Sequence, residues 1–196
     1  YTGTVTVTAG EDTFAVSFTL AVADVVLPAE SLKITNWFSL TNMAEAHGLT
    51  KWSDAHWKMI EKYGRLMRRM HQNVFWITWD TVEGTMDADG AFHFDFTNCE
   101  KLIRLYLSMG FTTIEGSPLF GRESWDAAEF HFNTPMGWIP ALSEDAYRYA
   151  AAFLTAWRDF LTAHGWYDIT LQHVGDEPTP KSADEYRILC GIVRKF

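Results

Sequence analysis

Two adjacent acidic residues, Asp176 and Glu177, lie in the stretch HVGDEP near the C-terminus. A pair of carboxyl groups can carry out acid–base chemistry, or it can mark the start of a helix, where the helix dipole favours negative charge. The prolines that follow would also suit a helix start. However, Ser182 and Glu185 match a capping box, which already begins the next helix. We therefore expect both acids to lie in the loop before that helix.

Adjacent acids favour one kind of glycoside hydrolysis over another. An ordinary retaining glycosidase places two carboxyl groups about 5–5.5 Å apart across the scissile bond, and these usually come from different strands. Neighbouring residues tend to diverge, so Glu177 could reach the glycosidic oxygen as an acid while Asp176 lies beside the sugar. This arrangement fits substrate-assisted chemistry, in which the 2-acetamido oxygen of the sugar is the nucleophile.

The elements that would position these acids alternate between strand and helix patterns. Strand patterns occupy 32–40, 73–79, 111–116 and 168–174. Helix patterns follow each of them, at 53–70, 97–110, 143–164 and 183–196. Such repetition predicts a parallel sheet, as in a doubly wound fold or in the first half of a (β/α)8 TIM-type barrel. No GxGxxG or P-loop follows the first strand, which disfavours the nucleotide-binding version.

The N-terminal residues follow a different pattern. Residues 1–31 contain alternating stretches around Val5, Val7, Phe14 and Val16, which predict short strands. Two or three strands are too few for a stable domain. We expect 1–31 to be the C-terminal strands of a β-sandwich, and 32–196 to be the N-terminal half of a catalytic barrel of the α/β class.

Strand ends supply the other candidate site residues, because parallel α/β folds keep their chemistry at the C-terminal ends of the strands. The same edge should carry two long excursions, 80–97 and 117–142, and long loops are usually functional. The second is rich in aromatic residues and could form a pocket wall. The substrate-binding candidates chosen in this way are Trp37, Trp79, Glu115, Arg122 and His173.

Composition excludes several classes of function. The net charge is −9 and no run of Lys or Arg occurs, so we expect no nucleic-acid partner. No apolar run approaches about 18 residues, so no membrane span is expected. Cys99 and Cys190 are far apart and give no disulfide framework or metal-binding spacing. We expect no metal and no cofactor, and no signal peptide is visible.

Several motifs resemble one family. The stretch HVGDEP with Tyr186 after it, the segment NWFSLTNMAEAHGLTKWSDAHWKMIEKYGRLM and the segment LYLSMGFTTIEGSPLFGR are similar to the catalytic domain of glycoside hydrolase family 123. The resemblance runs from about residue 30 to the end and is most specific at GDEP. It implies that Glu177 is the general acid/base and that Asp176 orients the 2-acetamido group.

The family resemblance also implies a substrate and a longer chain. Characterised members act on terminal β-linked N-acetylhexosamine as exo-β-N-acetylgalactosaminidases, which points to an extracellular or periplasmic protein. The resemblance implies a chain organised as a β-sandwich, a (β/α)8 barrel and a further β domain in series. This chain ends after the fourth βα unit, so we expect a fragment whose partners are the remaining barrel half and the flanking β domains. Such a fragment can be inactive alone.

Two alternatives remain open at the level of the sequence. A non-catalytic carbohydrate-binding or structural barrel fragment would hold a glycan on its aromatic loop without turnover. A glycosidase for a sugar without an acetamido group would need a second carboxylate from the missing half, about 5–5.5 Å from Glu177.

Overall fold

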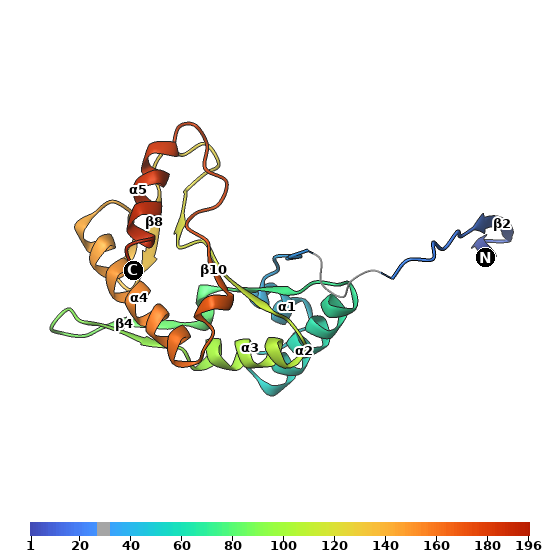
Figure 1. Cartoon of the computed structure of the whole chain (residues 1–196), viewed down its shortest axis with the longest axis horizontal. Coiled ribbons are helices and arrows are strands. Elements are labelled where there is room, and N and C mark those ends of the chain that lie inside the picture. The colour runs from blue at the N-terminus through green and yellow to red at the C-terminus, as the bar shows by residue number, and fades with distance from the viewer. Residues whose placement is uncertain (27–31) are drawn as a thin grey trace. The chain divides into compact units, whose positions relative to one another are not determined.

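The computed structural model of the chain describes residues 1–26 and 32–196 (Figure 1). It divides into two compact units, Tyr1–Ser31 and Leu32–Phe196. The predicted boundary at residue 31 lies outside the described residues.

The first unit is a β-hairpin. Strands β1 (Thr2–Ala9) and β2 (Asp12–Thr19) pair antiparallel, which confirms the strand pattern. The turn contains Gly10 at φ +64°, a conformation that glycine adopts without steric cost. The register pairs Val5 with Val16 and Val7 with Phe14, so one face of the hairpin is apolar while the other carries mainly threonine.

The second unit is a mixed α/β structure built around a parallel sheet. Its sheet has the strand order β10-β6-β3 and contains β3 (Val74–Ile77), β6 (Thr113–Gly116) and β10 (Thr170–Gln172). Its helices are α1 (Leu40–Ala46), α2 (Asp54–Arg69), α3 (Thr97–Ser108), α4 (Glu144–Ala163) and α5 (Ala183–Val193). Short 3₁₀ turns span Trp79–Thr81 and Tyr167–Ile169.

The first predicted strand, at 32–40, is wrong. Residues 32–39 form no strand, and Leu40 begins α1. The backbone amides of Asn73 and Val74 both donate to the Ile34 carbonyl. The neighbouring hydrogen bonds of the segment are made by side chains and not by a strand ladder. The Asn73 amide group accepts from the Ile34 N–H at 2.9 Å and donates to the Leu32 carbonyl at 2.8 Å. The segment 32–39 therefore lies alongside the start of β3 without forming a strand of the sheet.

The two excursions contain regular structure. Strands β4 (Glu83–Met86) and β5 (Phe92–Asp95) form an antiparallel hairpin, and the turn between them contains Gly90. The region 117–142, expected to be a loop without regular structure, contains an antiparallel sheet of β7 (Phe120–Gly121), β8 (His131–Thr134) and β9 (Gly137–Pro140). The alternation of Phe130 and Phe132 with polar residues was a strand signal that the expectation of a loop overlooked.

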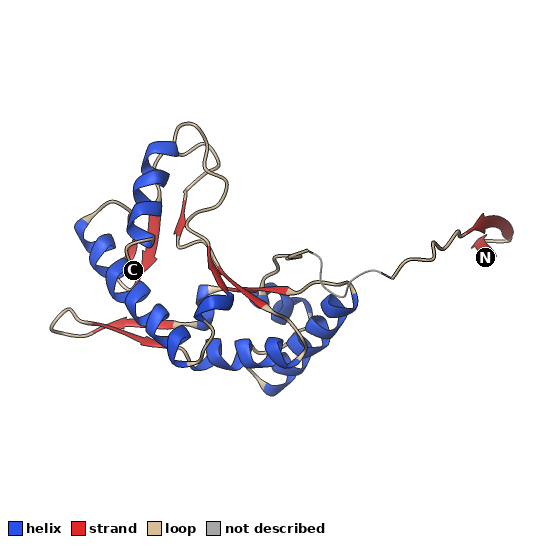
Figure 2. Ribbon diagram, in the orientation of Figure 1, coloured by secondary structure: helices blue, strands red, loops and turns tan. Residues whose placement is uncertain are grey.

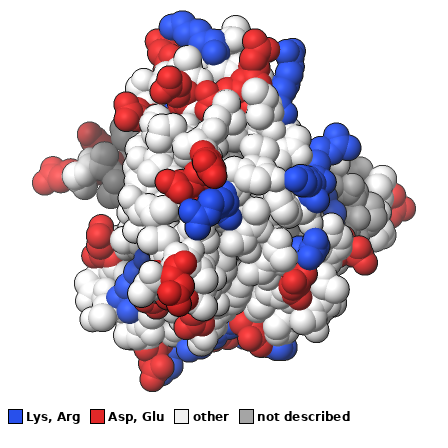
Figure 3. All heavy atoms as spheres, turned by 90° about the vertical axis from the view of Figure 1, so that its left-hand side faces the viewer, with Lys and Arg blue, Asp and Glu red and all other residues white. Residues whose placement is uncertain are grey.

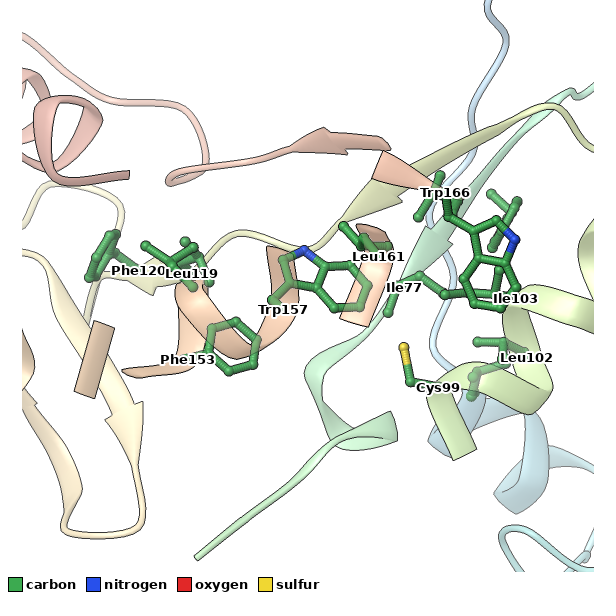
Figure 4. Packing of buried hydrophobic residues seen from close by; sticks show 14 of the residues in the cluster. Ile77, Cys99, Leu102, Ile103, Leu119, Phe120, Phe153, Trp157, Leu161 and Trp166 are labelled. Atoms are coloured by element: carbon green, nitrogen blue, oxygen red, sulfur yellow. The ribbon is translucent and has the colours of Figure 1, made fainter. Parts of the chain in front are cut away.

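The core of the second unit lies on one face of the parallel sheet, where α2, α3 and α4 lie, whereas α5 packs against α4 (Figure 2). Phe75 of β3 and Ile114 of β6 are paired in register and almost fully buried. Phe75 stacks on Tyr106 of α3 with ring centroids 4.9 Å apart. In Figure 4, Trp157 of α4 stands in the middle of a row of buried side chains. Burial of such apolar surface is the main force that stabilises the unit.

The opposite face of the sheet is open. Trp76, Glu115 and Leu171 occupy matched positions on the three strands. Trp76 and Glu115 are half-buried, and Leu171 is 55% exposed. Helices α2, α3 and α4 thus lie on one face of the sheet, and the other face carries the exposed apolar side chain of Leu171.

Candidate active site

The acid pair lies in the loop between β10 and α5. After β10 ends at Gln172, the chain stays paired with the strand that follows β6: the Phe120 amide donates to the Val174 carbonyl at 3.0 Å, and Phe120 forms a parallel bridge with Gly175. Asp176 and Glu177 come directly after this bridge, and both are exposed. Helix α5 begins at Ala183. The acids are therefore not part of a helix start.

The predicted capping box of α5 is wrong, although Ser182 does stand at the N-cap position. The Ser182 hydroxyl accepts from the Thr179 amide at 3.0 Å and makes no capping hydrogen bond to α5. The Glu185 carboxylate accepts from the Phe130 amide at 2.9 Å. Both side chains stabilise the loop that carries the acids. Ser182 closes the turn at Thr179, and Glu185 links α5 to Phe130, next to β8.

Arg122 holds the backbone of the acid pair. Its guanidinium donates to the carbonyl of Glu177 at 2.8 Å and to that of Asp176 at 3.3 Å. It also donates to the Trp125 carbonyl at 2.7 Å and lies 5.5 Å from the centre of the Phe130 ring. Its contacts to the pair use backbone oxygens, so both carboxylates stay free.

Glu177 adopts a left-handed backbone conformation, with φ +42°. For a residue other than glycine this costs about 1–3 kcal/mol and persists only where the surroundings enforce it. The hydrogen bond from Arg122 to the Glu177 carbonyl is such a constraint. Within residues 1–26 and 32–196, neither acid side chain makes a hydrogen bond or ion pair with the protein.

Three of the predicted binding residues come together on the open face of the sheet. The Glu115 carboxylate accepts from the Trp37 indole N–H at 3.0 Å and from the Thr35 hydroxyl at 2.7 Å. The Trp37 ring stacks on Trp76, with centroids 4.9 Å apart, and lies 5.3 Å from the His173 ring. This cluster combines a fixed carboxylate with a partly exposed indole face.

Trp79 lies apart from that cluster, against the helices. Its indole N–H donates to the carbonyls of Ser117 and Pro118, each at 3.1 Å. Its ring meets Phe153 and Trp157 of α4 edge to face, at 5.0 and 5.6 Å. The half-buried ring therefore contributes mainly to packing, and it also lines a cavity.

Two cavities adjoin this edge of the sheet. The larger, about 490 Å³, is bounded by Trp79, by parts of β7–β9 and by α4. The smaller, about 290 Å³, is lined by Arg122 and Asp176 among others. Pro118, Phe120 and Gly121 line both. Glu177 lines neither of the two.

Sequence reasoning did not identify the ionic contact of Asp80. Lys51 lies 2.5 Å from the Asp80 carboxylate, and Thr41 donates to it at 3.2 Å. Burial opposes ionisation of Asp80, but the hydrogen bonds from Lys51 and Thr78 outweigh it, so the pKa of this carboxyl lies below its usual value. The position of Asp80 after a strand was the available signal, whereas Lys51 is distant in the sequence.

Charge and composition at the surface add little to the definition of the site. On the face shown in Figure 3, basic and acidic side chains are interspersed. Among the described residues, no three His, Cys, Asp or Glu side chains are grouped so that they could hold a metal ion. No helix in that part of the chain has the length and apolar character needed to cross a membrane.

Comparisons with known proteins identify the family. Residues 37–196 match the family described as glycoside hydrolase 123, catalytic domain. The chain is also similar to the structure of a family 123 glycoside hydrolase from Clostridium perfringens, solved in a study of glycolipid glycan hydrolysis, with a TM-score of 0.69 and 18% sequence identity. That likeness covers 96% of this chain and 38% of the other. No curated protein matched the chain. Since the family match extends over most of its length, this chain belongs to glycoside hydrolase family 123.

Proposed function

We propose that this chain supplies the proton donor and the acetamido-binding group of a retaining exo-glycosidase that removes terminal β-linked N-acetylhexosamine, most notably N-acetylgalactosamine. One observation carries the proposal: two adjacent carboxylates stand at the end of a parallel strand, with their backbone held and their side chains free. Family membership supports glycoside hydrolysis as the reaction class.

The proposed reaction proceeds in two steps. In the first, Glu177 donates its proton to the glycosidic oxygen while the acetamido oxygen attacks the anomeric carbon, so that the leaving alcohol departs and an oxazolinium forms. Asp176 accepts a hydrogen bond from the acetamido N–H and balances the developing positive charge. In the second, Glu177 takes a proton from water as the water oxygen attacks the same carbon. The oxazolinium ring opens, and the configuration at the anomeric carbon is retained.

The cluster on the open face of the sheet supports the sugar in this proposal. The N–H of Trp37 is used by Glu115, so the indole offers its ring face for stacking against a pyranose. His173 lies beside that ring and precedes the acid loop. Arg122 and Trp79, predicted to contact substrate, are assigned other roles here: Arg122 positions the acid loop, and Trp79 lines the larger cavity.

The finer architecture is also a proposal. Helices on one face of a parallel sheet, with apolar Leu171 on the other face, suit the first half of a (β/α)8 barrel, in which the open face would become the interior. The chain spans 38% of the length of the matched structure, which leaves room for four further βα units. The apolar face of the N-terminal hairpin suits the last strands of a β-sandwich.

The experiment is to assay Glu177→Gln and Asp176→Asn in the complete protein on an aryl β-N-acetylgalactosaminide. Each change should lower kcat by about a hundredfold or more, because general acid–base catalysis alone contributes about 10²–10⁴. The control is Asp184→Asn, an acid at the start of α5 that pairs with Arg187, which should leave kcat within about twofold.

Rates that do not change in either variant would rule out this assignment. Failure of a thiazoline analogue to inhibit the enzyme would exclude participation of the acetamido group and point to a sugar without one. Calorimetric saccharide binding without turnover in the complete protein would support the carbohydrate-binding alternative.

A further inference from the structure

The larger cavity has the features of a second sugar site. We propose that it binds the sugar on the leaving-group side of the scissile bond, with the Trp138 ring as the stacking platform. This rests on the proposed glycosidase function. At about 490 Å³ the cavity falls within the range of about 300–1,000 Å³ that is usual for small-molecule sites.

The platform is built into the exposed face of the β7–β9 sheet. The register places Gly121 beside His131, and Asn133 beside Trp138, on one face. Trp138 stacks on His131 with centroids 5.4 Å apart and planes 7° from parallel, yet it remains 44% exposed. One ring face is therefore supported by protein, and the other is available to a ligand.

Gly121 is needed for this placement of the indole. A Cβ atom at this position would lie 2.6 Å from the Trp138 ring, closer than real contacts allow. The absence of a side chain therefore lets the ring lie close to the backbone of β7. Glycine in a strand otherwise weakens it, so its presence here suits a close approach of another group.

Polar groups that suit a sugar line the same cavity. Asn133 is the cross-strand neighbour of Trp138 and is exposed, and its side chain makes no hydrogen bond within the described part of the chain. Asp80 lies in the wall of the same cavity, where Lys51 balances its charge. Burial raises the pKa of Tyr149 to about 12, so its hydroxyl stays protonated and can donate. A pyranose presents both an apolar face and hydroxyl groups, and it would match this lining.

The location of the cavity indicates which sugar it would hold. Neither Asp176 nor Glu177 lines it, so it is not where the glycosidic bond is cleaved. It shares Pro118, Phe120 and Gly121 with the smaller cavity that Asp176 lines. An exo-acting enzyme removes a terminal sugar, so the substrate continues only on the leaving-group side. A neighbouring site is thus suited to the next sugar.

The link between the two sites is short, because it runs through two consecutive residues. Gly121 lies under the Trp138 ring, and the next residue, Arg122, donates to both carbonyls of the acid pair. A sugar stacked on Trp138 would therefore be held at a fixed position relative to the proton donor. Such fixed orientation is what allows remote binding energy to lower the barrier of the chemical step.

The test compares two substrates in the complete protein: a disaccharide with β-N-acetylgalactosamine linked to galactose, and methyl β-N-acetylgalactosaminide, which has no second sugar. Trp138→Ala should lower the ratio of the two kcat/KM values about tenfold, the scale expected for loss of one aromatic stacking contact. Gly121→Ala should lower the same ratio by displacing the ring. Tyr167→Ala, which removes an exposed aromatic ring before β10, is the control and should leave the ratio within twofold.

A ratio within twofold of wild type in both Trp138→Ala and Gly121→Ala would overturn the proposal. If the wild type cleaves neither substrate, the proposed glycosidase function is wrong. The role of Trp138 in binding is then tested by calorimetry with the disaccharide. In that case, disaccharide affinity should fall about tenfold in Trp138→Ala, and an unchanged affinity would overturn the site.

Discussion

At the scale of single residues, Arg122 holds the backbone of the acid loop in place. Its hydrogen bonds reach the carbonyls of Asp176, Glu177 and Trp125. A guanidinium can donate in several fixed directions at once, which an ammonium group cannot do. The left-handed conformation of Glu177 is stabilised by these bonds, and so is the direction of its carboxyl group.

We therefore predict that Arg122→Ala lowers kcat by about ten- to a hundredfold, the usual scale for a misplaced catalytic group. Because the free carboxylates themselves remain, KM should change much less than kcat. Arg122→Lys should recover only part of the loss, since it cannot reproduce the planar set of donors. Glu123→Ala, at an exposed neighbouring position, is the control. Equal activity of the Arg122 and Glu123 variants would contradict the role of Arg122 in positioning the acid loop.

Asp80 makes stability depend on pH. Its folded-state pKa is lowered, with the hydrogen bonds of Lys51 and Thr78 outweighing burial. Its contribution is therefore present above the unfolded pKa of about 3.9 and is lost as the pH falls through the lower folded value. Asp80→Asn should lower Tm at pH 7 by at most about 2–4 °C, because a carboxylate that is 36% exposed contributes at most about 1 kcal/mol after solvent screening.

That difference in Tm should shrink when thermal unfolding is followed at decreasing pH below about 3.9. Asp126→Asn, at an exposed position, should show no such pH-dependent difference. A deficit in the Asp80 variant that stayed constant down to low pH would show that the ionised carboxylate is not its cause.

At the scale of elements, the segment 32–39 depends on two side chains of the next strand region. The Asn73 amide group satisfies the Ile34 N–H and the Leu32 carbonyl. Gln72 accepts from the Asn36 side chain at 3.2 Å and donates to the Val74 carbonyl at 2.9 Å. These contacts keep Trp37 close to Glu115, so the position of one binding candidate depends on side chains remote from it.

Asn73→Ala should therefore destabilise the chain by about 1–3 kcal/mol, because the Ile34 N–H and the Leu32 carbonyl lose their hydrogen bonds to the buried Asn73 side chain. Denaturant unfolding measures this loss, and hydrogen exchange at the Ile34 amide should become faster. Asn73→Asp is the comparison variant: it keeps the acceptor for Ile34 but places a buried carboxylate oxygen against the Leu32 carbonyl, so near neutral pH its loss should be at least as large as that of Asn73→Ala. A neutral Asn73→Ala variant would refute the role of the side chain.

At the scale of the whole molecule, the open face of the sheet distinguishes this chain from a complete barrel. Leu171 and Leu66 are each 55% exposed, but Leu171 is on the open face of the sheet and Leu66 is on helix α2. If the face closes into a barrel interior, only Leu171 becomes buried. The two leucines thus form a matched pair for testing the proposed architecture.

We predict that Leu171→Glu is nearly neutral in this chain alone, within about 0.5 kcal/mol, as surface substitutions usually are. In the complete protein the same change should cost about 3 kcal/mol or more, because it buries an unpaired charge. Leu66→Glu should be nearly neutral in both, as measured by denaturant unfolding. Equal effects of Leu171→Glu in the two forms would rule out closure over this face.

Local sequence patterns were sufficient for most of the helices and for three of the four strands. The helix patterns at 53–70 and 143–164 identified α2 and α4, and the serines at which these patterns begin, Ser53 and Ser143, accept capping hydrogen bonds. The pattern also identified the acid pair and its place after a strand. These features depend on neighbours in the chain, so the sequence alone was enough to predict them.

Features that depend on residues distant in the sequence were decided only by the tertiary structure. The segment 32–40 has a strand-like pattern, but Asn73 takes over its pairing. Ser182 and Glu185 have the spacing of a capping box, but Thr179 and Phe130 are their actual partners. The same holds for Arg122, which meets the acid loop across more than fifty positions. Hydrogen-bonding groups pair with whichever partner the fold brings within reach, and sequence spacing does not specify that partner.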